Sequence, residues 1–241
     1  MKIYGKNAIT ESLRANKAVF NLYVQDSFED KPSEILALAH KQHIKVNFVD
    51  RYTLTKLVGN EHHQGYVADI EDFCYSEVED MFDLARTKGE QPFLVMLDGV
   101  EDPHNLGSIL RVCECAGVHG VIIPKYRACP INETVAKTSA GALEHMLIAR
   151  VANLNNTITK LKKEGVWVYA VELGGESLYR QNLTGELCLV IGSEGNGIAP
   201  LVKKNCDAVV TMPMFGKVNS LNASVACGVA VFEAVRQRRK L

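Results

Sequence analysis

The fold is decided by two stretches near the carboxyl terminus, LVIGSEGNGIAP (189–200) and MPMFGKVNSLNASVA (212–226). The apolar run 187–191 predicts a buried parallel strand that stops at Gly192, and two more glycines follow within five residues. Glycines this close together permit an unusual turn or the close approach of a ligand to the peptide groups. On its own, this cluster fits an ordinary strand-to-helix turn equally well.

The second stretch adds polar groups at the start of a helix. A strand-like run at 209–212 is ended by Pro213, and a long apolar helix is predicted over 221–238. Two polar side chains would be enough to cap this helix, so the surplus indicates a site. The polar residues are Asn219, Ser220, Asn222 and Ser224.

A third polar cluster, DGVEDPHNLGSILR (98–111), follows the apolar strand predicted at 93–97. A helix is expected to begin near Asn105, and the i, i+3, i+6 spacing is expected to place Asn105, Ser108 and Arg111 along one face, away from the apolar side. An amide, a hydroxyl and a guanidinium along two helical turns suit a phosphate or a ribose. The alternative is a capped helix that carries a surface arginine.

Strands and helices alternate through the carboxyl-terminal part, which predicts a mostly parallel sheet in an α/β fold. Further strands are expected at 121–123, 147–151 and 167–171, with helices at 133–144 and 156–164. Ligands of such sheets bind beyond the carboxyl ends of the strands. Because all three polar clusters follow strands, we expect them to form one composite site.

Composition narrows the class of protein. The chain has 241 residues, 47% hydrophobic content and a net charge of -1, so it can form a substantial core without an overall basic character. No apolar run reaches the roughly 20 residues of a membrane span, and MKIYGKNAIT lacks the apolar centre of a signal peptide. We therefore expect a cytoplasmic protein with no membrane partner.

Cysteine and histidine usage argues against a metal site. The seven cysteines include no CxxC pair and lie mostly in apolar runs, which favours reduced core residues. Adjacent His62 and His63 do not have the spacing of ligands on one helix face. We expect no metal.

Three segments differ in character. Residues 1–72 alternate short helices and strands and predict a small α/β domain, whereas 73–91 carries 5 acidic and 2 basic residues and is interpreted as a linker. Residues 92–241 form the larger parallel-sheet domain and carry 16 basic and 13 acidic residues. Any attraction for a polyanion is therefore regional.

Taken together and in order, the three polar clusters resemble the signature motifs of the SpoU-TrmH (SPOUT) family of RNA ribose 2'-O-methyltransferases. The likeness covers about 92–238. The segments GKNAITESL (5–13) and HHQGYVA (62–68) resemble the RNA-binding domain of the RlmB type, which is similar to ribosomal protein L30e. That type methylates a guanosine ribose in 23S rRNA, so the resemblance implies an RNA partner, with no role for DNA.

The resemblance further implies S-adenosylmethionine as cofactor, a homodimer, and a deep trefoil knot in the carboxyl-terminal domain. Matched position by position, the cofactor residues are Gly192, Met212, Ser220 and Leu221, and the characteristic polar positions are Asn105, Arg111, Glu194 and Asn222. In the family an arginine matching Arg111 is proposed as the base. Because a guanidinium keeps its proton, we expect Arg111 instead to hold the target phosphate and the developing alkoxide, and Glu194 and Asn222 to order the loops.

Three alternatives stay open. A nicotinamide-dependent oxidoreductase would need G-x-G-x-x-G and an acidic residue about 20 positions later, whereas the order here is G-x-x-G-x-G and Met212 stands at that distance. A non-catalytic RNA-binding protein on the same fold is opposed by the intact Asn105, Arg111 and Asn222. Within the family, tRNA is the alternative substrate to rRNA.

Overall fold

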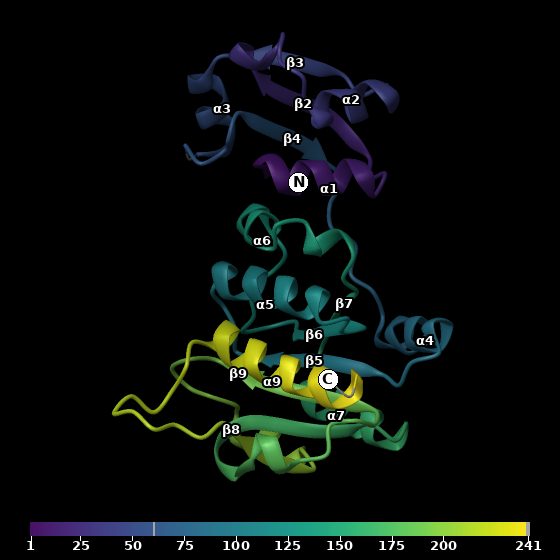
Figure 1. Ribbon diagram of the computed structural model, residues 1–241, viewed down its shortest axis with the longest axis vertical. Helices are drawn as coiled ribbons and strands as arrows, with labels where there is room; N and C mark the ends of the chain where they lie inside the picture. The colour runs from purple at the N-terminus through teal and green to yellow at the C-terminus, as the bar shows by residue number, and fades with distance from the viewer. Residues whose placement is uncertain (60, 240–241) are drawn as a thin grey trace. The chain divides into compact units, whose positions relative to one another are not determined.

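The computed structural model describes residues 1–59 and 61–239, which divide into two units (Figure 1). Unit 1 comprises Met1–Cys74 and Ile131–His145. Unit 2 comprises Tyr75–Pro130 and the described residues from Met146 onward. The chain therefore leaves the larger unit after Pro130, adds a short segment to the smaller unit, and returns.

Unit 1 is built on a mixed four-stranded sheet in the order β1-β4-β2-β3, in which only β2 and β3 are parallel. Its strands are β1 (Lys2–Tyr4), β2 (Val19–Gln25), β3 (Val46–Val49) and β4 (Tyr66–Ile70), and its α-helices are α1 (Lys6–Arg14), α2 (Glu34–Lys41), α3 (Arg51–Val58) and α6 (Glu133–Thr138). Helix α1 buries Ile9 and Leu13 completely, and Asp50 caps α3 by accepting a hydrogen bond from Thr53 N at 2.9 Å. The small α/β character expected for this part of the chain is confirmed.

The helix expected over 133–144 is interrupted. Helix α6 stops at Thr138, and a 3-10 turn, η2 (Ala142–Glu144), follows. Between them Ala140 and Gly141 have φ angles of 52° and 99°, which lie outside the right-handed helical region. A Cβ at Gly141 would lie 2.3 Å from Cγ of Glu11, so close packing against α1 requires glycine there.

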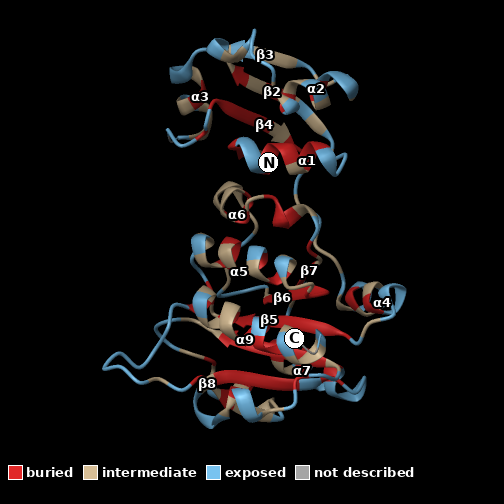
Figure 2. Cartoon of the chain, viewed as in Figure 1, coloured by how far each residue is buried: buried red, intermediate tan, exposed pale blue. Residues whose placement is uncertain are grey.

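Unit 2 contains six parallel strands in the order β10-β8-β9-β5-β6-β7. They are β5 (Phe93–Asp98), β6 (Gly120–Pro124), β7 (Ile148–Val151), β8 (Trp167–Ser177), β9 (Leu187–Gly192) and β10 (Ala208–Thr211). The two central strands, β5 and β9, are buried along nearly their whole length, as Figure 2 shows. The parallel sheet predicted from alternating strands and helices is confirmed.

Helices cover both faces of this sheet. Leu94 and Met96 of β5 share an apolar cluster with α4 (Val78–Lys88), α7 (Leu154–Lys163) and α8 (Pro200–Asn205). Alternation along the strand turns Phe93 the other way, and the Arg238 guanidinium of α9 (Ala223–Arg239) lies 5.0 Å from the centre of its ring. Helix α5 (Pro103–Cys115) packs beside α9 on that face (Figure 1).

The segment expected as a linker, 73–91, contains helix α4. Met81 and Ala85 of this helix are fully buried, and Met81 packs so closely that a Cβ at Gly120 would lie 2.3 Å from its sulfur. From Tyr75 onward the segment is part of unit 2. The linker interpretation rested on the acidic residues of this segment and did not take into account the apolar helix face formed by Met81 and Ala85.

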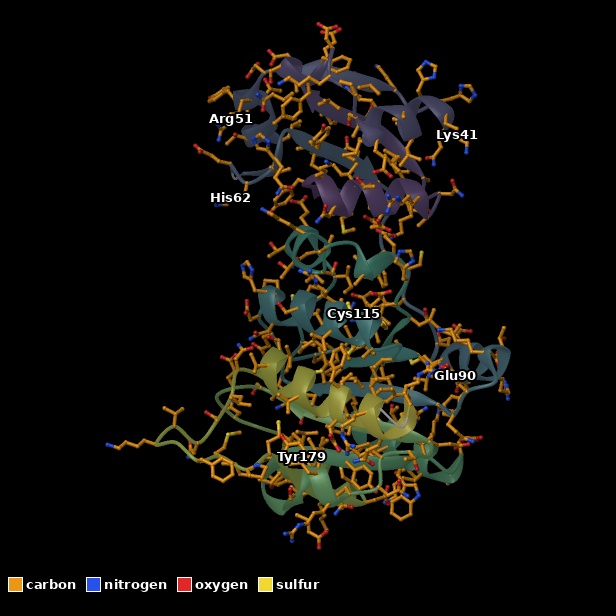
Figure 3. The ribbon with its side chains drawn as sticks, viewed as in Figure 1. Lys41, Arg51, His62, Glu90, Cys115 and Tyr179 are labelled. Carbon is orange, nitrogen blue, oxygen red and sulfur yellow. The ribbon has the colours of Figure 1, made fainter. Side chains whose placement is uncertain are left out.

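The cysteines only partly match the expectation of core residues. Four of them are buried, but Cys206 is half-buried and both Cys74 and Cys115 are exposed, Cys115 at the end of α5 (Figure 3). All seven are free thiols. No helix in the described part of the chain is long and apolar enough to cross a membrane.

Candidate active site

The polar clusters after β5 and β9 meet because these strands are neighbours. Asp98, the last residue of β5, is the register partner of Gly192, the last residue of β9. The Asp98 carboxylate is buried and accepts a hydrogen bond from Ala199 N at 2.8 Å, which ties the end of β5 to the segment leading into α8. The polar clusters that follow β5 and β9 are about 90 residues apart in sequence, and they therefore begin next to each other in the structure.

Gly192 opens a tight turn that only glycine can form. A Cβ at this position would lie 2.3 Å from the carbonyl carbon of Gly197 and 2.5 Å from the nitrogen of Ile198. Ser193 and Gly197 exchange two backbone hydrogen bonds, of 3.2 and 2.9 Å, and Gly197 has a φ of 63°. The glycines thus serve a close backbone approach within the turn itself.

A cavity of about 180 Å³ opens beside this turn. Its wall combines the middle of β8, the turn after β9 and the segment between β10 and α9. The four residues expected to bind the cofactor all line it, together with Glu194. The lining includes Val171, Glu172, Leu173, Ile191, Gly192, Glu194, Ile198, Met212, Ser220 and Leu221.

Three of the four expected polar residues form one hydrogen-bonded network. Asn105 donates from Nδ2 to Glu194 Oε1 at 3.1 Å, and Asn222 donates from Nδ2 both to Asn105 Oδ1 at 2.9 Å and to Glu194 Oε1. Each residue comes from a different motif. The network therefore joins the loops after β5, β9 and β10 on one edge of the sheet.

Both helices beside the network start at a capped position. The Asp102 carboxylate accepts hydrogen bonds from His104 N and Asn105 N, each at 3.2 Å, and so begins α5. The Asn222 amide oxygen accepts from Ser224 N at 3.0 Å and from Val225 N at 3.3 Å at the start of α9. Asn222 therefore caps α9 with its oxygen while its nitrogen holds the network, which explains why α9 begins at Ala223 rather than at the expected Leu221.

Arg111 lies apart from this network. It is exposed, and it forms no hydrogen bond or ion pair with any residue among 1–59 and 61–239. Six residues along α5 separate it from Asn105, which corresponds to about 9 Å of helix. Its guanidinium is therefore available to a group from outside the subunit.

The sequence interpretation did not include Glu172. This carboxylate accepts a hydrogen bond from Ile198 N at 3.3 Å and forms a 2.9 Å ion pair with Lys203, so it ties the middle of β8 to the turn and to α8. The signal was present, because Glu172 directly follows the buried strand residues Val168–Val171. It is a further polar group at this edge of the sheet, directly after the last residue of β8 that pairs with β9.

The two adjacent histidines have different surroundings, because His63 is buried and His62 is exposed. His63 is buried, its Nδ1 accepts from Gly65 N at 3.0 Å and its Nε2 is 3.2 Å from Thr55 Oγ1. Burial lowers the pKa of His63. Among the described residues no group of three or more His, Cys, Asp or Glu side chains is placed to hold a metal ion.

Comparison with known proteins agrees with this arrangement. The SpoU rRNA Methylase family matches residues 92–232, and a model described as RNA 2'-O ribose methyltransferase substrate binding matches residues 2–76. The TrmH-family protein YacO of Bacillus subtilis (strain 168) is 43% identical over 239 residues, which cover 98% of this chain and 95% of YacO.

A second relative is the 23S rRNA (guanosine-2'-O-)-methyltransferase RlmB of Escherichia coli (strain K12), which is 40% identical and matched over 98% of both chains. The crystal structure of the SpoU methyltransferase AviRb from Streptomyces viridochromogenes with its cofactor AdoMet superposes with a TM-score of 0.82. It is 23% identical and covers 99% of this chain and 90% of its own, so it supports the fold. The family match spans more than half of the sequence and the relatives match almost all of it, and the chain therefore belongs to the SpoU rRNA Methylase family.

Proposed function

We propose that this protein transfers a methyl group from S-adenosylmethionine to the 2'-hydroxyl of a ribose in RNA, most specifically a guanosine of 23S rRNA. The observation that carries the proposal is the Asn105–Glu194–Asn222 network beside the cavity at the carboxyl ends of β5 and β9. Family membership supports the reaction class, and the position of the network beside the cavity supports its assignment to the active site.

The cavity fits the proposed cofactor in chemical character. Val171, Ile191 and Leu221 offer apolar walls to an adenine ring, while the tight turn at Gly192 exposes backbone groups to its polar edges. The carboxylates of Glu172 and Glu194 favour the positive charge of a sulfonium. We assign cofactor binding to Gly192, Met212, Ser220 and Leu221.

The chemistry requires positioning more than activation. When bound, S-adenosylmethionine would supply a methyl group on a sulfonium. The ribose oxygen would form the new bond to that carbon as the carbon–sulfur bond breaks, the thioether would leave, and the proton of the hydroxyl would pass to water. Holding the ribose in line with the methyl group can supply several kcal/mol of the barrier reduction, roughly 7–11 in the best intramolecular cases. We assign this holding to the network, because it fixes three loops at once.

Arg111 is assigned to the substrate. Its guanidinium keeps its proton, so it suits binding of the target phosphate and stabilisation of the negative charge that develops on the ribose oxygen. Its freedom from partners within the described chain supports this role, because no internal carboxylate competes for it. Glu194 and Asn222 order the loops, since both side chains are engaged with each other and with Asn105.

The substrate follows from the relatives and from the amino-terminal part. RlmB of Escherichia coli is named for 23S rRNA, and the substrate-binding model matches residues 2–76. We propose that residues 1–72 bind RNA, that 73–91 connect them to the catalytic part, and that 92–241 carry the reaction. The second candidate is tRNA, because YacO of Bacillus subtilis is named as a TrmH family tRNA/rRNA methyltransferase.

Two further properties implied by the family stay predictions. A homodimer is supported by α9, which leaves Val225 and Phe232 about half exposed on a helix with an otherwise buried apolar side. A second copy could cover these side chains and bring an additional Arg111 to the site. The trefoil knot and a cytoplasmic location belong to the same proposal.

The proposal is tested by incubating the protein with S-adenosylmethionine labelled in the methyl group and with unmodified 23S rRNA or tRNA. Label on 23S rRNA that depends on Arg111 supports the full proposal. Label on tRNA alone keeps the reaction and overturns the substrate. Calorimetry that detects no binding of S-adenosylmethionine would overturn the enzyme assignment, with Gly192→Ala as the non-binding control.

A further inference from the structure

The loop after β6, defined here as the β6 loop (Lys125–Pro130), lies on the same edge of the sheet as the candidate active site. Lys125 N continues the strand pairing with a 2.8 Å hydrogen bond to Val151 O. At the other end Cys129 is buried and its N donates to Val100 O at 3.0 Å. Because Val100 lies in the polar cluster after β5, this bond holds the β6 loop beside the segment that leads to Asn105.

Between these two anchors the side chains point outward. Tyr126 is 71% exposed, and Lys125 and Arg127 on either side of it are exposed as well. The Lys125 ammonium lies 5.9 Å from the centre of the Tyr126 ring, within the range of a cation–π contact. The loop therefore presents an aromatic ring between two cations.

Neither Lys125 nor Arg127 forms an ion pair with a carboxylate in the described part of the chain. In unit 2, Arg236 pairs with Glu233 and Arg239 with Glu90, but none of the ion pairs among the described residues includes Lys125 or Arg127. Arg127 also has a φ of 56°, an uncommon conformation for a residue with a side chain. A strained backbone that displays an unpaired charge is typical of functional loops.

We propose that the β6 loop binds single-stranded RNA next to the target nucleotide, with Tyr126 stacked on a base and Lys125 and Arg127 bound to neighbouring phosphates. Aromatic rings flanked by cations bind unpaired nucleotides through stacking and charge. The inference rests on the proposed function, because it assigns the nucleotides beside the methylated ribose to this loop.

The backbone conformation supplies a clean variant for the test. A left-handed φ is accommodated better by glycine than by any other residue, so Arg127→Gly removes the charge without straining the loop. Tyr126→Phe keeps the ring and removes only the hydroxyl. Matched controls lie at the opposite, amino edge of the sheet, where Trp167 begins β8 with an exposed ring and Lys163 ends α7 with an exposed charge.

The experiment measures KM and kcat for methyl transfer to an unmodified 23S rRNA transcript, together with calorimetric binding of S-adenosylmethionine. Tyr126→Ala is expected to raise KM for the RNA by about 5- to 100-fold. Cofactor affinity stays unchanged in Tyr126→Ala, and the controls Trp167→Ala and Lys163→Ala stay within twofold of the parent. Tyr126→Phe, which keeps the ring, is expected to have a lower KM for the RNA than Tyr126→Ala. Arg127→Gly is expected to reduce the salt dependence of RNA affinity by about 0.7 in the logarithmic slope.

Other results overturn the inference. If Tyr126→Ala and Arg127→Gly leave KM within twofold while the parent methylates the transcript, the β6 loop does not bind RNA, although the proposed function stands. If the parent binds the cofactor but methylates no RNA, the proposed function fails, and filter binding of the same transcript with the same variants decides the role of the loop. A change in oligomeric state in Tyr126→Ala would identify the loop as a protein contact instead.

Discussion

The interior of β5 and β9 differs sharply from the ends of the same two strands. Along the interior, paired residues such as Val95 and Leu189 are apolar and completely buried. Immediately beyond the ends, Glu194 and its partners from the neighbouring loops are polar and accessible. One pair of strands thus supplies stability from its middle and the reactive groups from its end, so substitutions in the two regions should have separable effects.

The largest effect is expected in the interior. Leu94→Ala removes a fully buried side chain from the apolar cluster, which should lower the free energy of unfolding by about 2–5 kcal/mol. Urea unfolding measures this loss. In the fraction that stays folded, kcat and cofactor affinity should remain within twofold, and a tenfold fall in kcat of the folded protein would show that the two regions are not independent.

Arg111→Ala should have the converse effect. Because the side chain is exposed and unpaired within the described chain, thermal unfolding should not change, whereas kcat should fall by about 10²-fold, or about 2.7 kcal/mol. Single-turnover methyl transfer measures the chemical step. Arg111→Lys is the matched control, since it keeps the charge but loses the planar guanidinium. Near-normal turnover of this variant would count against a bidentate contact between the guanidinium and a phosphate.

Asn222 contributes both to stability, as the cap of α9, and to the polar network, and its variants separate these two contributions. Asn222→Ala removes the cap of α9, at a cost of about 1 kcal/mol in stability, and also breaks the network, so kcat should fall by about tenfold. Asn222→Asp keeps an oxygen that can cap the helix but cannot donate to Asn105, and it adds a charge beside Glu194. Normal stability with low kcat is expected for this variant, and normal kcat would mean that the network has no part in the reaction.

The smallest effect concerns pH. Burial lowers the pKa of His119, whose Nδ1 accepts from Phe93 N at 3.0 Å at the start of β5. A histidine with a lowered pKa in the folded state contributes stability above its unfolded pKa of about 6.5, and this stability is lost as the pH falls below that value. Chemical unfolding between pH 7.5 and 5 should show the decrease.

His119→Asn provides the control for this prediction. Its amide oxygen can replace Nδ1 as the acceptor, but the side chain does not titrate. The pH dependence should therefore become shallower, with the part that remains including His63, whose pKa is also lowered by burial. An unchanged slope would show that His119 does not contribute.

The fold class could be predicted because the apolar runs and the helical periodicity of the carboxyl-terminal part agree with each other. The meeting of three loops followed from a general property of parallel sheets, and the structure brings Asn105, Glu194 and Asn222 into contact. The neighbouring positions of β5 and β9 could not be predicted, because strand order depends on how the whole sheet packs.

Two other features depend on tertiary contacts that no local pattern reveals. The segment Ile131–His145 folds with unit 1, where Glu144 accepts a hydrogen bond from Ser12 Oγ at 2.7 Å and pairs with Lys17. Arg111 was expected to share one face with Asn105, but six helical residues also rotate it well away from that side chain. The helical pattern of the sequence correctly placed Asn105 and Arg111 on α5, but it did not show that their side chains point in different directions.

The most direct test of the account is the chemical position of the transferred methyl group. Labelled 23S rRNA from the reaction would be hydrolysed with alkali, which cleaves RNA through the free 2'-hydroxyl and leaves the bond after a 2'-O-methylated ribose intact. The account predicts that the label stays in alkali-resistant dinucleotides and accumulates about 10²-fold more slowly with Arg111→Ala. Label recovered in ordinary mononucleotides would place the methyl group on a base and contradict the assignment of this site to ribose methylation.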